Sequence, residues 1–203
     1  DQITVHLRED RRFNNERDLE LLRRTVRSEL NLEMAPTQDA VTVALQHRPD
    51  TVTLMPERRD EPGASSGLDV TGSQDNLRRV LQLLPDAKIR VSLLVDPDLD
   101  QIRAAHKLDA HAVERCTGRY AEVRSFSERN DELGRLRDAA KTAQRLGRGV
   151  AAGHGLNYSN VPPVCRIQEV QELNVGHCIV ARAVMVGFDR AVRDMLDVLR
   201  EAR

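Results

Sequence analysis

The sequence predicts an α/β protein of the (β/α)₈ barrel class, and three features of the chain lead to that prediction. Seven short apolar runs recur along the 203 residues, and helical segments separate them. The runs show little alternation, which suits strands of a parallel sheet that is buried on both faces. An ionisable side chain ends or closely follows each run, and such side chains at the carboxyl ends of barrel strands commonly form an active site.

The seven expected strands are spread along the whole chain. They are Ile3–Val5, Leu30–Leu32, Thr51–Met55, Val91–Val95, His111–Val113, Val150–Gly153 and Leu173–Gly176. A closed barrel needs one more strand and helix, and we expect that unit to precede Asp1, so that this chain carries seven of the eight strands. Residues 1–203 are then expected to form a single, N-terminally truncated barrel domain.

Helical patterns lie between the expected strands. Apolar residues at helical spacing follow polar residues that favour helix N-termini. The expected helix starts are Asn15, Thr37, Ser73, Asp98 and Ser127. We expect only a short helix between His154 and Glu172, because two prolines stand there, and a closing amphipathic helix over 189–203. The stretch 60–72 contains proline and glycines and is expected to be a long active-site loop.

The composition excludes several classes of function. The formal net charge is −1 and there is no tryptophan, so neither a basic surface nor stacking platforms for nucleic acid are expected. No apolar stretch reaches the roughly 20 residues that cross a bilayer. Cys116, Cys165 and Cys178 form no C-x-x-C pair, which argues against a zinc ribbon or a disulfide framework and favours the cytoplasm.

Three ionisable residues are the candidates for acid–base catalysis. His6, Glu33 and His154 follow three different strands, and barrel geometry would bring them together. Two imidazoles and a carboxylate can pass protons in both directions near neutral pH. The alternative is that each residue is only a polar plug at a strand end.

Glu114 is a fourth candidate, at the end of the expected fifth strand. A carboxylate there would stabilise a cationic imine or oxocarbenium intermediate by its charge. The alternative is a structural ion pair between Glu114 and Arg115 or Arg119.

Two phosphate sites are expected. Gly176 and His177 lead from the last strand directly into a helix, and backbone N–H groups at such a turn bind phosphate. Gly155 would offer a further amide from the neighbouring strand end. Arg8 is the candidate for a second phosphate, because a planar guanidinium matches that anion.

Lysine and metal chemistry are not favoured. Lys88, Lys107 and Lys141 do not follow any expected strand, so a Schiff base on the protein is not expected and any imine nitrogen would come from a substrate. The histidines show neither H-x-H nor H-E-x-x-H spacing, so we expect no metal site.

The weaker alternatives for other histidines and for cysteine stay open. A zinc site that joins His6, His154 and His177 is one, and Cys116 as a nucleophile rather than a small buried side chain is another. The remaining histidines are expected to be structural; they are His47, His106 and His111.

Five segments closely resemble pyridoxine 5′-phosphate synthases, in the same order and over essentially the whole chain. They are Ile3–Arg12, Asn31–Ala35, Ser66–Val70, Ala152–Leu156 and Glu172–His177. The resemblance implies a cytoplasmic (β/α)₈ transferase of vitamin B6 biosynthesis that assembles as a homo-oligomer, typically an octamer. It implies the condensation of 1-deoxy-D-xylulose 5-phosphate with 3-amino-2-oxopropyl phosphate to pyridoxine 5′-phosphate, phosphate and water, without a metal or organic cofactor.

The resemblance also implies roles for single residues. His6 and Glu33 resemble the family's proton acceptors, His154 its proton donor and Glu114 its transition-state stabiliser. Arg8 resembles a contact to the deoxyxylulose phosphate. The expected contacts to the amino-oxopropyl phosphate are Gly155, Gly176 and His177.

The chain departs from the family pattern at several positions. The family's first strand, with its Asn-x-Asp-His segment, has no counterpart here. Phe13 stands where the family usually has a histidine that touches a substrate phosphate, and Gly63 stands where a loop threonine is expected. Cys116 replaces a histidine and Ala181 a glycine. Two alternatives therefore remain: a different sugar-phosphate isomerase or lyase, and a non-catalytic barrel remnant that binds phosphates or packs in an oligomer.

Overall fold

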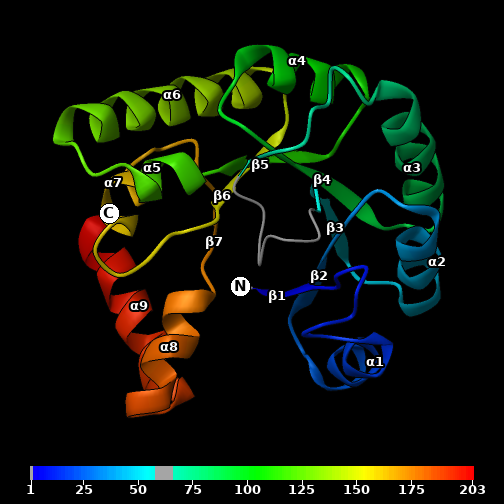
Figure 1. Cartoon of the computed structure of the whole chain (residues 1–203), viewed down its shortest axis with the longest axis horizontal. Coiled ribbons are helices and arrows are strands. Elements are labelled where there is room, and N and C mark those ends of the chain that lie inside the picture. The colour runs from blue at the N-terminus through cyan, green and yellow to red at the C-terminus, as the bar shows by residue number, and fades with distance from the viewer. Residues whose placement is uncertain (1, 58–65) are drawn as a thin grey trace.

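The computed structural model describes residues 2–57 and 66–203, and it contains a parallel sheet surrounded by helices (Figure 1). The strands are β1 (Gln2–His6), β2 (Glu29–Met34), β3 (Thr51–Leu54), β4 (Arg90–Val95), β5 (Ala112–Cys116), β6 (Gly149–Gly153) and β7 (Glu172–Asn174). The helices are α1 (Glu16–Thr25), α2 (Gln38–His47), α3 (Gln74–Asp86), α4 (Leu99–Lys107), α5 (Gly118–Glu122), α6 (Phe126–Arg145), α7 (Val161–Cys165), α8 (His177–Val186) and α9 (Phe188–Ala202). Each expected strand is present.

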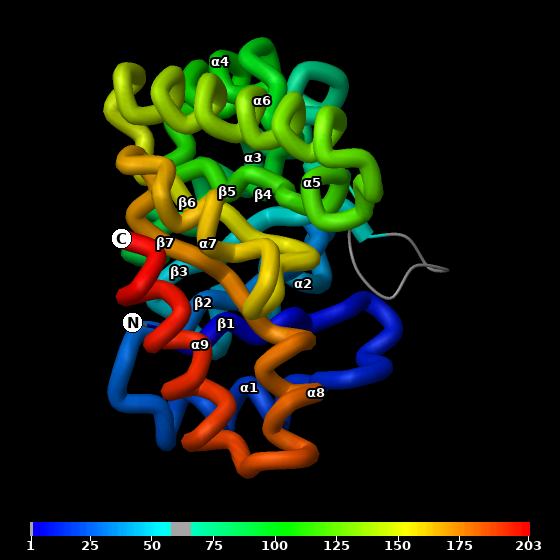
Figure 2. Tube along the Cα trace, turned by 90° about the vertical axis from the view of Figure 1, so that its left-hand side faces the viewer, coloured from blue at the N-terminus to red at the C-terminus, as the bar shows by residue number. Residues whose placement is uncertain are grey.

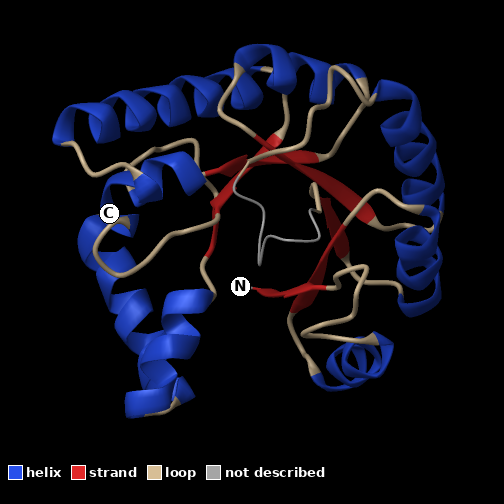
Figure 3. Cartoon of the chain, viewed as in Figure 1, coloured by secondary structure: helices blue, strands red, loops and turns tan. Residues whose placement is uncertain are grey.

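The sheet is a nearly closed barrel. Its strands pair in the order β1-β2-β3-β4-β5-β6-β7, and every neighbouring pair is parallel. The strands surround a central axis and the helices lie outside them (Figure 3). Side chains connect the two edge strands, because Gln2 Nε2 donates to Glu172 Oε1 at 2.6 Å and Thr4 Oγ1 donates to Asn174 Oδ1 at 3.0 Å. Since all strands run the same way, their carboxyl ends form one rim.

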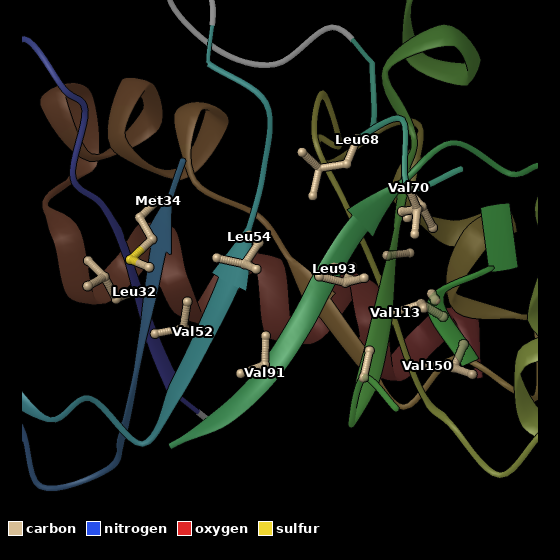
Figure 4. Packing of buried hydrophobic residues seen from close by; sticks show 14 of the residues in the cluster. Leu32, Met34, Val52, Leu54, Leu68, Val70, Val91, Leu93, Val113 and Val150 are labelled. Atoms are coloured by element: carbon tan, nitrogen blue, oxygen red, sulfur yellow. The ribbon is translucent and has the colours of Figure 1, made fainter. Parts of the chain in front are cut away.

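The main hydrophobic core lies between the sheet and the helices. Alternate strand residues supply it (Figure 4); those labelled on the strands are Leu32, Met34, Val52, Leu54, Val91, Leu93, Val113 and Val150. In β2 the buried Leu30, Leu32 and Met34 face this core, so Asn31 and Glu33 must face the barrel interior. The inner face also holds a small separate cluster of Met55, Leu94 and Cys116.

The interior of the barrel is partly polar, although the strands are buried on both faces as expected. Thr53 Oγ1 donates to Asn31 Oδ1 at 3.1 Å, and Asn31 Nδ2 donates to Thr4 Oγ1 at 3.4 Å. The side chains satisfy one another across β1, β2 and β3, so their burial leaves these groups hydrogen-bonded. Apolar packing on the outer face therefore holds the barrel together, and the inner face is available for polar groups.

Three of the expected helix starts carry the expected side-chain caps. Asn15 forms a capping box with Asp18, Thr37 accepts from Ala40 N at 3.4 Å, and the Asp98 carboxylate accepts from two backbone N–H groups of α4. Ser73 precedes α3 as expected, but its side chain makes no capping hydrogen bond.

One expected helix start was wrong, and one short helix was not foreseen. The long helix α6 begins at Phe126, because Ser125 rather than Ser127 accepts the capping bond from Glu128 N. The short helix α5 was not expected.

Figure 2 shows that α8 and α9 run side by side at the end of the chain, and α9 begins at Phe188, one residue before the expected start. No helix in the described ranges is long and apolar enough to cross a membrane.

The loop after β3 reaches the carboxyl rim of β4. Gly67 N donates to Asp96 Oδ1 at 2.8 Å and Leu68 N donates to Leu94 O at 2.8 Å. A Cβ atom on Gly67 would lie 2.2 Å from Asp96 N, so only glycine allows this close approach. Gly63, which departs from the family pattern, lies outside the described residues.

Candidate active site

Four of the predicted residues meet at the carboxyl rim, inside the barrel. His6 is the last residue of β1, and Glu33 is its partner in the register with β2. Glu114 lies in β5, and His154 directly follows β6. His6 and Glu33 point inward because their strand neighbours belong to the outer core. The geometric prediction that His6, Glu33 and His154 share one rim therefore agrees with the structure.

His6 is a neutral imidazole at physiological pH. Its pKa is lowered to about 4, chiefly because burial disfavours the charged form and further because Arg8 is positive. Asp10 raises the pKa of His6 and His154 lowers it. His6 Nε2 has no hydrogen-bond partner within the described ranges. A neutral imidazole with a free nitrogen can accept a proton.

Glu33 holds its proton more tightly than an ordinary carboxyl. Its pKa is raised to about 7, and the cause is burial. A carboxyl with this pKa exchanges its proton near neutral pH, which is the property that a general acid or base needs.

Glu114 is buried deeper, below the rim. Burial is the largest cause that raises its pKa to about 8, the negative charge of Glu33 adds to the rise, and a hydrogen bond with Asn174 opposes it. A Cβ atom on Gly153 would lie 2.2 Å from Glu114 Oε1, so the carboxylate packs directly under this glycine. Gly153 directly precedes His154, so the Glu114 carboxylate packs against the residue just before His154 in the chain.

The alternative for Glu114, a structural ion pair, receives only partial support, because the charge of Arg115 lowers the pKa of Glu114. Neither Arg115 nor Arg119 forms an ion pair with it in the described part of the chain. Arg119 pairs with Glu132 at 3.4 Å, and Arg115 Nη2 donates to Ala151 O at 2.8 Å. Glu114 Oε2 has no hydrogen-bond partner among the residues described, which leaves it free for another group.

His154 occupies an unusual turn. Its φ is +81°, a left-handed conformation that non-glycine residues seldom adopt, and Gly155 follows with φ +74°. Burial lowers the pKa of His154, and the negative charge of Glu122 opposes that change. The side chain is half-buried, so it can contact both the barrel interior and a bound molecule.

The expected phosphate-binding residues lie on two sides of the rim. Gly155 follows β6, and Gly176 and His177 are exposed at the start of α8, just after β7. No described side chain caps the start of α8. Ile179 N donates to Gly176 O at 2.9 Å, so the N–H groups ahead of it, at the turn of Gly176 and His177, are the ones that could face an anion.

Arg8 is more constrained than the sequence suggested. Its side chain is buried, Nε contacts Asp10 Oδ1 at 3.1 Å, and Nη2 lies 3.6 Å from Glu57 Oε1. Glu57 in turn accepts from the backbone N–H of Glu9 at 2.9 Å. These two carboxylates hold the guanidinium next to His6, and sequence reasoning did not identify them.

A nucleophilic cysteine, a lysine Schiff base and a metal site find less support at this rim. Burial raises the pKa of the Cys116 thiol to about 12, which keeps it protonated and unsuited to be a nucleophile. The three lysines lie in α4, in α6 and before β4, away from the strand ends. Among the described residues, no group of three metal-ligating side chains is placed to hold a metal ion.

Two hollows lie at the opposite end of the barrel, at the amino ends of the strands. One encloses about 490 Å³ and is lined by Arg23, Glu29 and Asp50 among others, and its neighbour of about 320 Å³ also reaches Arg90. Ion pairs already join these residues, Arg23 with Asp50 at 2.7 Å and Arg90 with Glu29 at 2.6 Å. This end of a barrel usually serves stability, so the candidate site stays at the carboxyl rim.

A parallel barrel with ionisable side chains at its carboxyl rim is the arrangement typical of (β/α)₈ enzymes. Solved structures agree on the fold: KGPDC from Streptococcus mutans has a TM-score of 0.70 at 14% identity, over 100% of this chain and 86% of that one. Native KDPGal has a TM-score of 0.67 at 9% identity, over 98% of this chain and 81% of that one.

Sequence relatives identify the family. The family model described as "Pyridoxal phosphate biosynthesis protein PdxJ" matches residues 1–201. Pyridoxine 5′-phosphate synthase of Synechococcus sp. (strain JA-2-3B'a(2-13)) is 55% identical over 96% of this chain and 82% of its own length. The pyridoxine 5′-phosphate synthase of Geotalea uraniireducens is 48% identical over 100% of this chain and 84% of its own length. The chain belongs to this family of vitamin B6 biosynthetic enzymes.

Proposed function

We propose that the protein is a pyridoxine 5′-phosphate synthase, a transferase that condenses 1-deoxy-D-xylulose 5-phosphate with 3-amino-2-oxopropyl phosphate. The products are pyridoxine 5′-phosphate, inorganic phosphate and water. The observation that carries the proposal is the convergence of His6, Glu33 and His154 at one rim, with Glu114 beneath them, in a chain of this family. The reaction needs several proton transfers, and this set of groups can perform them.

The protonation states support distinct roles for the four groups. His6 is neutral and Glu33 titrates near neutral pH, so both can accept a proton, and His154 is proposed as the donor by family resemblance. Glu114 with a pKa of about 8 holds its proton at neutral pH. A cationic intermediate beside it would favour the carboxylate form, which then stabilises that intermediate.

The substrates supply what the rim lacks. Since the three lysines lie elsewhere, the amine of 3-amino-2-oxopropyl phosphate provides the nitrogen of the imine. Arg8 is proposed to bind the phosphate of 1-deoxy-D-xylulose 5-phosphate. Gly155, Gly176 and His177 are proposed to bind the other phosphate through backbone amides and the imidazole. No metal or organic cofactor enters the proposed reaction.

Assembly and location remain predictions. We predict a cytoplasmic homo-oligomer, an octamer by family resemblance. Val180, Val184 and Met185 expose apolar side chains on α8, which is a surface of the kind that subunit contacts cover. Sedimentation of the purified protein would measure the oligomer size.

Substitution of His154 tests the proposed function. Purified protein is mixed with both substrates, and the release of phosphate and formation of pyridoxine 5′-phosphate are followed. We expect His154→Asn to lower turnover by about 10²–10⁴-fold, as the loss of a general acid does. His106→Asn, on the outer helix α4, should leave turnover near that of the wild type. Failure of the wild-type protein to form product would favour the non-catalytic alternative.

A further inference from the structure

The turn that carries His154 needs support from its surroundings. Both His154 and Gly155 have left-handed backbone conformations, with φ of +81° and +74°. A histidine seldom adopts this conformation, so it persists only where neighbouring groups enforce it. The turn fixes the direction of the Cα–Cβ bond of His154. The backbone conformation therefore determines where the imidazole points.

Thr117 provides that support from the end of β5. It directly follows Cys116, the β5 partner of Gly153, and its side chain is fully buried. The N–H of Thr117 donates to Gly153 O at 2.8 Å. Its Oγ1 lies 2.7 Å from Gly153 O and 2.5 Å from His154 O, so the single hydroxyl proton is shared between two carbonyl oxygens of the turn.

A second group holds the far side of the same turn. Asn160 Nδ2 donates to Gly155 O at 3.0 Å, and the hydroxyl of Tyr120 in α5 donates to Asn160 O at 2.8 Å. Three consecutive carbonyl oxygens, those of residues 153–155, therefore each accept a hydrogen bond from a neighbouring side chain. Thr117 differs from Asn160 because its hydroxyl contacts the carbonyl of His154 itself.

We propose that Thr117 is a positioning residue that directs the His154 imidazole, an inference that rests on the proposed function of His154. Its hydroxyl binds the carbonyl oxygens on both sides of the His154 Cα atom and so holds the left-handed turn. Without the hydroxyl, the His154 carbonyl loses its donor and the peptide plane can rotate. The imidazole would then leave the position from which it reaches the substrate, although His154 itself is unchanged.

The test compares Thr117→Val, which keeps the shape but removes the hydroxyl, with Thr117→Ser, which keeps the hydroxyl. We expect Thr117→Val to lower kcat by about tenfold to 10²-fold with little change in KM, because a small misplacement of a catalytic group has effects of this size. Thr117→Ser should restore kcat to within about threefold of the wild type. Thr42→Val is the matched control, since the Thr42 hydroxyl bonds the Gln38 carbonyl on the surface of α2, away from the rim.

NMR of the His154 imidazole provides the readout that a purely structural role would not change. We expect Thr117→Val to shift the pKa and ring signals of His154, and Thr117→Ser and Thr42→Val to leave them in place. Unchanged His154 signals and kcat, with only a lower Tm, would overturn the inference. The NMR comparison decides it even if the protein makes no pyridoxine 5′-phosphate. If Thr117→Val does not fold, Thr117→Ala against Thr117→Ser makes the same comparison, because these two differ only in the hydroxyl.

Discussion

His6 and Glu33 are direct partners across β1 and β2, and their pKa values are inverted relative to an ordinary imidazole and carboxyl. Burial raises the pKa of Glu33 to about 7, while burial and the charge of Arg8 lower the pKa of His6 to about 4. Near neutral pH the carboxyl, rather than the imidazole, carries the exchangeable proton. Environments that push neighbouring pKa values apart in this way assign different acid–base roles to adjacent groups.

The first prediction concerns the pH dependence of catalysis. As a proton acceptor Glu33 must be ionised, so kcat/KM should rise with pH through about 7. Glu114 keeps its own proton up to about pH 8, so Glu114→Gln removes no charge in this range and should leave the acid limb near pH 7. Glu20→Gln on the exposed face of α1 is the control. A shift of the acid limb to lower pH in the Glu114→Gln protein would show that Glu114 is already ionised there.

The second prediction concerns stability. The folded-state pKa values of Glu33 and Glu114 lie above the ordinary value of 4.5, so the folded protein binds these protons more tightly than the unfolded chain. The stabilisation is complete below about pH 4.5 and is lost as the pH rises through about 7 to 8. His6 acts in the opposite direction, but only below its ordinary pKa of 6.5.

Urea denaturation between about pH 7 and 8.5 isolates the carboxyls, because His6 is largely neutral in both states there. The free energy of unfolding should fall by on the order of 1 kcal/mol or more across this range. In Glu114→Gln the fall should be smaller, since one titrating group is gone. Equal slopes in the two proteins would show that Glu114 is ionised in the folded state throughout.

The sequence predicted the catalytic candidates because their positions follow from strand direction alone. His6, Glu33 and His154 each stand at or near the end of a strand, and parallel strands bring their carboxyl ends to one rim. The residues that support the site could not be predicted in this way. The contacts of Thr117 and Asn174 depend on the register of β5, β6 and β7 and on the left-handed turn, and no local sequence pattern reveals either.

The error at the start of α6, and the polar inner face of the sheet, have physical explanations. Ser125 and Ser127 are both good N-caps, and only the path of the chain out of α5 decides between them. The apolar runs concealed a polar inner face, because Thr4, Asn31 and Thr53 are small and satisfy one another. Hydrogen bonds between strands that are distant in sequence cannot be read from either strand separately.

The third prediction concerns the contact between Gly153 and Glu114. A Cβ atom at Gly153 would lie 2.2 Å from Glu114 Oε1 and 2.9 Å from the Cβ of Asn174. Gly153→Ala should therefore displace the Glu114 carboxylate and lower kcat by about tenfold or more, with a loss of about 1–3 kcal/mol in stability. Gly134→Ala in α6 meets nothing within 4 Å and should retain activity. Wild-type kcat in Gly153→Ala would mean that the position of Glu114 is unimportant.

The fourth prediction separates Arg8 from its exposed neighbour. Arg8→Met should raise KM for 1-deoxy-D-xylulose 5-phosphate by about tenfold or more, because a charge-assisted phosphate contact is lost. KM for 3-amino-2-oxopropyl phosphate should change much less. Arg12→Met removes a more exposed guanidinium that pairs with the same Asp10, and it should leave both KM values nearly unchanged. Equal increases in both KM values after Arg8→Met would point to general disruption of the rim.

The last prediction tests the departure at Phe13. The side chain is 62% exposed, and the next residue fixes its loop to the rim because Asn14 Nδ2 donates to His6 O at 3.1 Å. An imidazole at position 13 would add a hydrogen-bond donor for phosphate on the side of the rim that holds Arg8. Phe13→His should therefore lower KM for 1-deoxy-D-xylulose 5-phosphate by about threefold to tenfold, which corresponds to one modest hydrogen bond.

Phe126→His is the control for this change, since Phe126 is 80% exposed at the start of α6. It should alter neither KM value. If Phe13→His leaves KM for 1-deoxy-D-xylulose 5-phosphate unchanged while Arg8→Met raises it, the phosphate binds to Arg8 without reaching the loop at residue 13. An effect of Phe13→His on 3-amino-2-oxopropyl phosphate instead would reverse the proposed assignment of the two phosphates to the two sides of the rim.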